Sequence, residues 1–119
     1  MNPEKIKQLK ENPFVENDSI AWEILSEKVK RKILLYDENV MMVCVAFAQG
    51  GVGALHRHPH VQTTLIKSGV FEVEIDGKKK VLKECDAFYI PSNALHGVQC
   101  LEDGELLDIF HPIREDFLN

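Results

Sequence analysis

The chain has 119 residues, which suits one domain with a hydrophobic core large enough to be stable without disulfides. Its formal net charge of −5 argues against nucleic acid as a partner, because binding a phosphate backbone requires a surplus of Lys and Arg on one face. No apolar run is long enough to cross a membrane and the N-terminus lacks the apolar core of a signal peptide, so we expect a cytoplasmic protein without a membrane partner.

The N-terminal part of the chain carries only weak patterns. Pro3 and Glu4 suit the first turn of a short helix that Asn12-Pro13 would end. Residues 20–35 mix apolar and charged side chains without a clear period, which indicates a helical turn followed by a strand. We therefore expect residues 1–30 to form an N-terminal arm that packs on the domain or makes dimer contacts.

A clear β pattern begins at residue 40. Residues 40–47 are apolar on both faces, as is typical of a strand that is covered on both sides. Residues 70–75 alternate, with Phe71, Val73 and Ile75 on one face and two glutamates on the other, which predicts a half-buried strand.

Turn residues divide the rest of the chain into short strands. Asp76-Gly77 is a hairpin signal, and the run Lys78-Lys79-Lys80 after it is expected to be solvated. Asn93, a residue type that tolerates positive φ, suits the tight loop after Pro91. Further strands are expected at residues 87–90, 97–101 and 105–110, the last two paired as a hairpin across Glu102-Asp103-Gly104.

Many short strands with hardly any helical periodicity predict an all-β sandwich or barrel. We expect a single β-barrel domain over residues 31–112, followed by a C-terminal tail over residues 113–119. Three cysteines, an odd number without paired spacing, favour buried reduced thiols over disulfides.

A histidine-rich segment lies between the expected strands. In an extended chain His56 and His58 leave the same face, which suits two ligands of one metal ion. A straight strand would carry Gln62 roughly 20 Å from His56, too far to share that ion. Pro59 fixes its own φ and donates no hydrogen bond, so we expect a bend that returns the Gln62 oxygen to the same point. His60, at the bend, is expected to face solvent or substrate.

Two segments of the sequence resemble the paired motifs of the cupin superfamily. Residues 51–62, followed by Gly69, are similar to the first motif, and residues 86–96 are similar to the second. The resemblance implies a small jelly-roll β-barrel with a metal at its mouth. The implied ligands are His56, His58, Gln62 and His96. Ni, Mn, Fe and Zn are all divalent transition metals that accept imidazole and amide oxygen.

The sequence departs from the usual cupin pattern at two positions. Cupins commonly have Glu where this chain has Gln62, and a neutral amide leaves the ion with its full charge. Such a centre should attract an anionic substrate and act as a Lewis acid. Cupins commonly have Gly at the position of Cys85, and we expect the Cys to alter only the turn geometry, because Cys can sit in a type I turn.

A narrower resemblance covers residues 101–118 together with residues 31–34. These segments resemble the pectin-degradation cupins that linearise unsaturated uronates, in which Gln at the third ligand position is normal. The resemblance implies conversion of a cyclic 4,5-unsaturated uronate monosaccharide, a small anionic sugar, to a linear 5-keto-4-deoxyuronate. Small cupins also commonly form homodimers, so a homodimer is expected.

The same resemblance implies roles for three residues near the C-terminus. Asp108 would carry the proton, and Arg114 would pair with the substrate carboxylate. Phe110 would pack against the sugar ring. His60 is a further candidate for substrate contact because of its place at the bend after Pro59, and not because of the resemblance. Each has a structural alternative: Asp108 as a strand-end carboxylate, Arg114 as a surface or dimer ion pair, and Phe110 as core.

Two other classes of function stay open. One is a dioxygenase-type cupin with redox-active iron, although Gln62 replaces the carboxylate that such sites commonly use. The other is a non-catalytic cupin that binds a sugar or another small molecule. For His56, His58 and His96 the structural alternative is a set of polar side chains at the mouth of the barrel without a metal.

Overall fold

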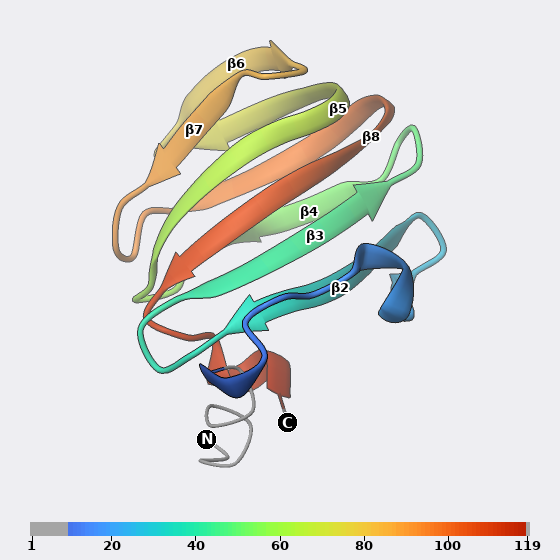
Figure 1. Ribbon diagram of the computed structural model, residues 1–119. Coiled ribbons are helices and arrows are strands. Elements are labelled where there is room, and N and C mark those ends of the chain that lie inside the picture. The colour runs from blue at the N-terminus through green and yellow to red at the C-terminus, as the bar shows by residue number, and fades with distance from the viewer. Residues whose placement is uncertain (1–9, 119) are drawn as a thin grey trace.

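A computed structural model describes residues 10–118, and residues 1–9 and 119 lie outside this description. The helix expected in the first dozen residues falls almost entirely on the part that is not described. The described chain is built mainly from antiparallel strands (Figure 1). In chain order the elements are η1 (Asn17–Ser19), β1 (Glu23–Ser26), β2 (Val29–Tyr36), β3 (Met41–Phe47), β4 (Val52–His56), β5 (Val61–Ile75), β6 (Lys78–Lys83), β7 (Ala87–Ile90), β8 (His96–His111) and η2 (Glu115–Leu118).

The strands form one continuous hydrogen-bonded sheet that folds back on itself. Its main path runs β1-β2-β3-β8-β5-β6, while β4 also pairs with β8 and β7 with β5. The two long strands β5 and β8 pair along almost their whole length and occupy the middle of Figure 1. Because each long strand also pairs with shorter strands beyond this ladder, the sheet curls into two layers. The prediction of a single all-β domain is confirmed.

Several expected strands are present. The strand expected at residues 40–47 is β3, and none of its residues is exposed, as a two-sided apolar pattern predicts. The strand at residues 87–90 is β7, and Asp76 and Gly77 adopt positive φ in the turn between β5 and β6. The lysine run lies on β6, with all three side chains exposed. Asn93 has a φ of 63°, as expected.

The hairpin expected across residues 102–104 is wrong. Residues 96–111 form one strand, β8, which pairs with β5 on both sides of this segment. The register of β5 against β8 shifts around residues 66–71, where the two strands bend together. A Cβ on Gly104 would collide with the backbone of Ser68 and Gly69. This glycine therefore allows two strands to approach closely and makes no turn.

The helical turn expected ahead of the strand in residues 20–35 is also wrong. Residues 23–26 form β1, which pairs antiparallel with β2, so the sheet begins inside the segment expected to be an arm. All four residues of β1 are exposed. An edge strand without a buried face has no alternating pattern, and this is why its sequence does not look like a strand.

Cys85 does not sit in a type I turn. Its φ is 72°, in the left-handed region where cupins commonly use Gly. Its side chain is exposed, while the other two cysteines are buried, and all three thiols are free. The expectation of buried thiols therefore holds at Cys44 and Cys100 and is wrong at Cys85.

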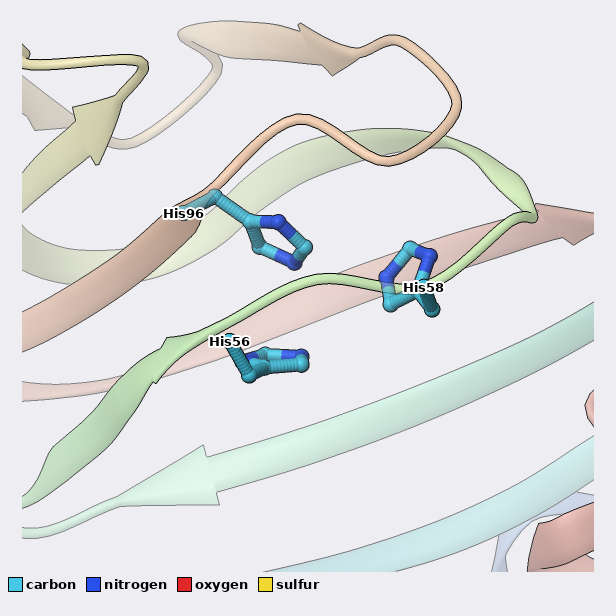
Figure 2. A group of neighbouring side chains, drawn as sticks. All are labelled: His56, His58 and His96. Atoms are coloured by element: carbon cyan, nitrogen blue, oxygen red, sulfur yellow. The ribbon is translucent and has the colours of Figure 1, made fainter.

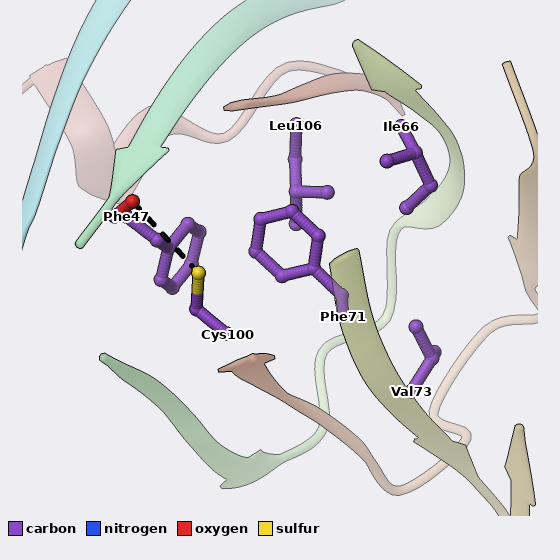
Figure 3. Packing of buried hydrophobic residues seen from close by; sticks show 6 residues of the cluster. All are labelled: Phe47, Ile66, Phe71, Val73, Cys100 and Leu106. Carbon is purple, nitrogen blue, oxygen red and sulfur yellow. Dashed lines mark hydrogen bonds between the residues drawn. The ribbon is translucent and has the colours of Figure 1, made fainter. Parts of the chain in front are cut away.

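Two clusters of apolar side chains stabilise the barrel. In the first cluster the rings of Phe47 and Phe71 meet edge to face with centroids 5.3 Å apart (Figure 3). Its members are Phe47, Ile66, Phe71, Val73, Cys100 and Leu106. The second cluster joins β3 to the C-terminal segment, and its members are Met41, Val43, Phe110 and Ile113. Within residues 10–118, no helix has the length and apolar character needed to cross a membrane.

Candidate metal centre and adjoining pocket

Three histidines converge at the mouth of the barrel. His56 ends β4, His96 begins β8, and these two residues lie opposite each other in the β4–β8 pair. His58 lies in the loop after β4 and completes the group (Figure 2). One ring nitrogen from each histidine lies within 4.8 Å of the other two. Residues far apart in the sequence are thus brought together by strand pairing, and the three histidines could hold a metal ion.

The hydrogen bonds made by the Nδ1 atoms of the three imidazoles leave a lone pair on each Nε2 atom. His56 Nδ1 lies 2.8 Å from the Ala54 carbonyl oxygen, and His96 Nδ1 lies 2.8 Å from that of Ala94. His58 Nδ1 contacts the His60 carbonyl oxygen at 3.0 Å. A carbonyl can only accept, so each Nδ1 must donate and each neutral ring keeps a lone pair on Nε2. This is how metal-binding histidines are usually oriented.

Burial keeps two of these rings neutral. Removal from solvent lowers the pKa of His96 to about 4, and it also lowers the pKa of His58. The buried His96 Nε2 finds no hydrogen-bond partner among residues 10–118. A buried acceptor without a donor is costly, and a metal ion would relieve that cost.

Gln62, at the start of β5, directs its amide oxygen to the same point. Its Oε1 lies 3.1 Å from His58 Nε2, while its NH₂ group donates to Thr64 Oγ1 at 2.9 Å and to Asp108 Oδ1 at 3.2 Å. When His58 is neutral, the contact between Oε1 and Nε2 places two lone pairs face to face. A cation between them would make this contact favourable, so the donor set fits a divalent transition metal.

Asp108 is on β8 and contacts the side-chain amide of Gln62, which is on β5. Asp108 is 9% exposed, and its carboxylate accepts a hydrogen bond from the Thr64 hydroxyl at 2.7 Å in addition to one from the Gln62 amide. Burial raises the pKa of Asp108 to about 6. Sequence analysis did not single out Thr64, but the period of two along β5 would have placed it on the same face as Gln62.

A pocket of about 220 Å³ connects these groups. Its polar lining comes from His56, Gln62, His96, Asp108 and Arg114. The rest of the lining is mostly apolar and includes Phe110 and Phe117. A larger hollow of about 720 Å³ lies beside β2, but none of its lining residues is a histidine of this group. The candidate functional site is therefore the smaller pocket.

The expected C-terminal tail closes one side of this pocket. Arg114 donates from Nε to Asp116 Oδ1 at 3.0 Å and from Nη2 to Asp116 Oδ2 at 2.8 Å. The Arg114 guanidinium also lies 4.3 Å from the centre of the Phe117 ring. Asp116 and Phe117 were not predicted as site residues, because the short η2 element carries no periodic signal.

Of the remaining two predicted site residues, Phe110 lines the pocket and His60 does not. Phe110 is 3% exposed, packs in the second core cluster and also lines the pocket, so core and wall are compatible roles. His60 is outside the residues that line the pocket. Its Nε2 contacts the Ile113 carbonyl oxygen at 3.2 Å, so this ring faces the C-terminal segment.

The metal-site geometry and the antiparallel barrel together indicate a cupin. A family model described as a cupin domain matches residues 43–110, and the chain belongs to this family. The folded sheet is therefore the jelly-roll barrel that the two sequence motifs predict.

Within the family, the chain is similar to pectin degradation proteins. It is 45% identical over 104 residues to the pectin degradation protein KdgF of Dickeya dadantii (strain 3937), covering 86% of this chain and 94% of that protein. The structure of KdgF from Halomonas sp. matches with a TM-score of 0.85 and 39% identity, covering 87% of this chain and 98% of that one. The structure of an RmlC-like cupin from Shewanella frigidimarina NCIMB 400 matches with a TM-score of 0.85 and 36% identity, covering 87% of this chain and 94% of that one. The narrower resemblance is confirmed.

Proposed function

We propose that the protein is a metal-dependent enzyme that converts a cyclic 4,5-unsaturated uronate monosaccharide into its linear 5-keto-4-deoxyuronate. One observation carries this proposal: a buried carboxylic acid, Asp108, is hydrogen-bonded to a candidate metal ligand at the wall of a small pocket that also contains an arginine. The similarity to pectin degradation proteins named KdgF supports the choice of a uronate.

The size of the pocket favours a single sugar ring. Its volume of about 220 Å³ is below the roughly 300 Å³ at which pockets for drug-sized ligands begin. An oligosaccharide would extend beyond it. The aromatic rings of Phe110 and Phe117 give the ring a flat apolar surface to pack against.

Asp108 is the group that moves the proton. The conversion is an isomerisation in which the C1 hydroxyl loses its proton, the bond from C1 to the ring oxygen breaks, and a proton ends on C4. An acid with a pKa of about 6 has both of its forms available near neutral pH, which suits a residue that accepts and donates in turn.

Arg114 binds the substrate carboxylate. Asp116 occupies the side of the guanidinium formed by Nε and Nη2, which leaves the Nη1 donors for a second anion. The apolar lining of the pocket would strengthen that charged hydrogen bond. A divalent ion held by neutral ligands would keep its full positive charge near Arg114, in keeping with an anionic sugar.

The metal would be held by His56, His58, His96 and Gln62, with Ni, Mn, Fe and Zn all compatible with these donors. When bound, such an ion supplies Lewis-acid stabilisation of negative charge on substrate oxygen.

The test is an assay with the products of a pectate or alginate lyase. Protein purified without an affinity tag is first analysed for its metal content, and loss of the absorbance of the 4,5 double bond is then followed. We expect metal-dependent loss of the double bond that a chelator abolishes and the added ion restores. Consumption of O₂ would instead support an oxygenase, and saturable sugar binding without turnover would support a binding protein; either result would contradict the proposal.

A further inference from the structure

Thr64 connects the candidate metal ligand Gln62 to Asp108. It is only 2% exposed, lies on the same face of β5 as Gln62, and faces Asp108 directly in the β5–β8 ladder. Strand register therefore places its hydroxyl between the two functional side chains. Its Oγ1 lies 2.7 Å from Asp108 Oδ1 and 2.9 Å from Gln62 Nε2.

The direction of these hydrogen bonds is determined by their chemistry. The ionised carboxylate of Asp108 can only accept, so in this form the single proton of the Thr64 hydroxyl points to Asp108. The hydroxyl oxygen can then only accept from Gln62, which requires the NH₂ group of the amide on that side. As a result the Gln62 oxygen is turned toward His58 Nε2.

A glutamine amide has nearly the same shape after a half-turn that exchanges its oxygen and nitrogen. In the exchanged state the NH₂ of Gln62 would donate to the lone pair of His58 Nε2, a favourable contact in the absence of a cation. Its oxygen would then face the Thr64 hydroxyl oxygen and the Asp108 carboxylate, both of which are electron-rich. Only the opposing contacts with Thr64 and Asp108 disfavour this exchanged state.

We propose that Thr64 is a positioning residue that holds the amide of Gln62 with its oxygen toward the three histidines and joins the metal centre to the proton-carrying carboxylate. This inference rests on the metal role proposed above. Without the hydroxyl, the amide loses one of its two acceptors and is released to donate to His58. A glutamine in that orientation presents hydrogens to the ion and cannot bind it.

The experiment compares Thr64→Val, which keeps the shape of the side chain without the hydroxyl, with Thr64→Ser, which keeps the hydroxyl. The full-length protein is stripped with a chelator, and its affinity for Ni²⁺ and for Mn²⁺ is measured by calorimetry. We expect roughly 10- to 100-fold weaker binding for Thr64→Val, the usual effect of removing a residue that orients a ligand. Thr64→Ser should bind nearly as tightly as the wild type. Thr63→Val, at the exposed neighbouring position on the other face of β5, is the matched control and should not change affinity.

Circular dichroism and thermal unfolding establish that each variant is folded, and Thr64→Ala replaces the Val variant if that one does not fold. Equal affinity for the wild type and the variant without a hydroxyl would overturn the role of Thr64 while leaving the metal centre intact. A loss of affinity that Thr64→Ser shares would also overturn it, because the hydroxyl would then not be the cause. A wild-type protein that binds neither ion would overturn both this inference and the proposed function.

Discussion

Single residues at the candidate site take their properties from burial and from hydrogen bonds to the backbone. The same desolvation that lowers the pKa of His96 raises that of Asp108. Burial therefore favours the neutral form of both groups, which leaves a lone pair on one and a transferable proton on the other. One physical cause thus acts on both the candidate metal ligand and the candidate proton carrier, without any ion pair between them.

Replacing Asp108 by Asn should abolish proton transfer by this residue without affecting metal binding. The Asn oxygen can still accept from Thr64 and Gln62, but the side chain can no longer exchange a proton near neutral pH. We expect turnover to fall by at least about 100-fold, the lower range for loss of a general acid or base. Metal content, measured by elemental analysis, should stay that of the wild type. Retained activity, or a loss of metal, would contradict the role of Asp108.

Cys85 offers a prediction about stability. Its positive φ costs a non-glycine residue about 1–2 kcal/mol, and part of this is offset because Gly has more freedom in the unfolded chain. Cys85→Gly should therefore raise the free energy of unfolding by about 0.5–1 kcal/mol in denaturant titrations under reducing conditions. Cys85→Ala keeps the strain and removes the thiol, so it should not stabilise. Equal gains in both variants would attribute the effect to the thiol.

Among the elements, the short C-terminal segment contributes two residues to the lining of the candidate pocket. Residues 113–118 contribute Arg114 and Phe117 to the pocket, and Ile113 contacts His60 in the loop between β4 and β5. Arg31 of β2 lies 4.0 Å from the Phe117 ring on this segment, so β2 also supports the pocket wall. The edge of the sheet and the end of the chain therefore define one side of the site together.

The ion pair within this segment should affect substrate binding more than chemistry. Asp116 is 60% exposed in its side chain, and pairs of this kind contribute little to stability, so Asp116→Asn should fold normally. Without Asp116, Arg114 is less well oriented, and we expect KM for the uronate to rise about two- to fivefold with little change in kcat. Glu115→Gln, an exposed neighbour in η2, is the control and should leave both constants unchanged. A fall in kcat alone would refute this positioning role.

At the scale of the whole molecule, local patterns were informative wherever the two faces of a strand differ in burial, as in residues 70–75, where Phe71 and Val73 are buried and both glutamates are only partly buried. The joint placement of His56, His58 and Gln62 also follows from local spacing, because a bend at a proline is encoded within a few residues. His96 joins them only through the pairing of β4 with β8, and the resemblance to cupins was what predicted it. The continuous β8 strand, the place of Thr64 and the wall formed by Phe117 depend on pairing between distant segments. Glu102-Asp103-Gly104 has the composition of a turn, and only the presence of β5 beside it shows that the glycine permits close approach.

In the metal-free protein, the buried side chains of Asp108 and His96 should have opposing effects on how the free energy of unfolding depends on pH. The pKa of Asp108 is raised from 3.8 to about 6, so the folded state binds more protons in this interval and stability falls as pH rises through it. The pKa of His96 is lowered from 6.5 to about 4, so its contribution to stability is lost as pH falls through nearly the same interval. The two effects oppose each other, and a shallow pH profile is expected for the wild type.

Asp108→Asn removes only the first of these effects. Relative to the wild type, the metal-free variant should gain stability as pH rises from about 4 to about 6, up to about 3 kcal/mol by the usual conversion of a pKa shift. Denaturant titrations of both chelator-treated proteins at several pH values measure this difference, in which the titrations of all other groups largely cancel. Asp18→Asn, at an exposed position in η1, is the control and should follow the wild-type profile. Parallel profiles for Asp108→Asn and the wild type would mean that the Asp108 carboxylate is not desolvated in the folded protein, and its suitability as a proton carrier near neutral pH would fall with it.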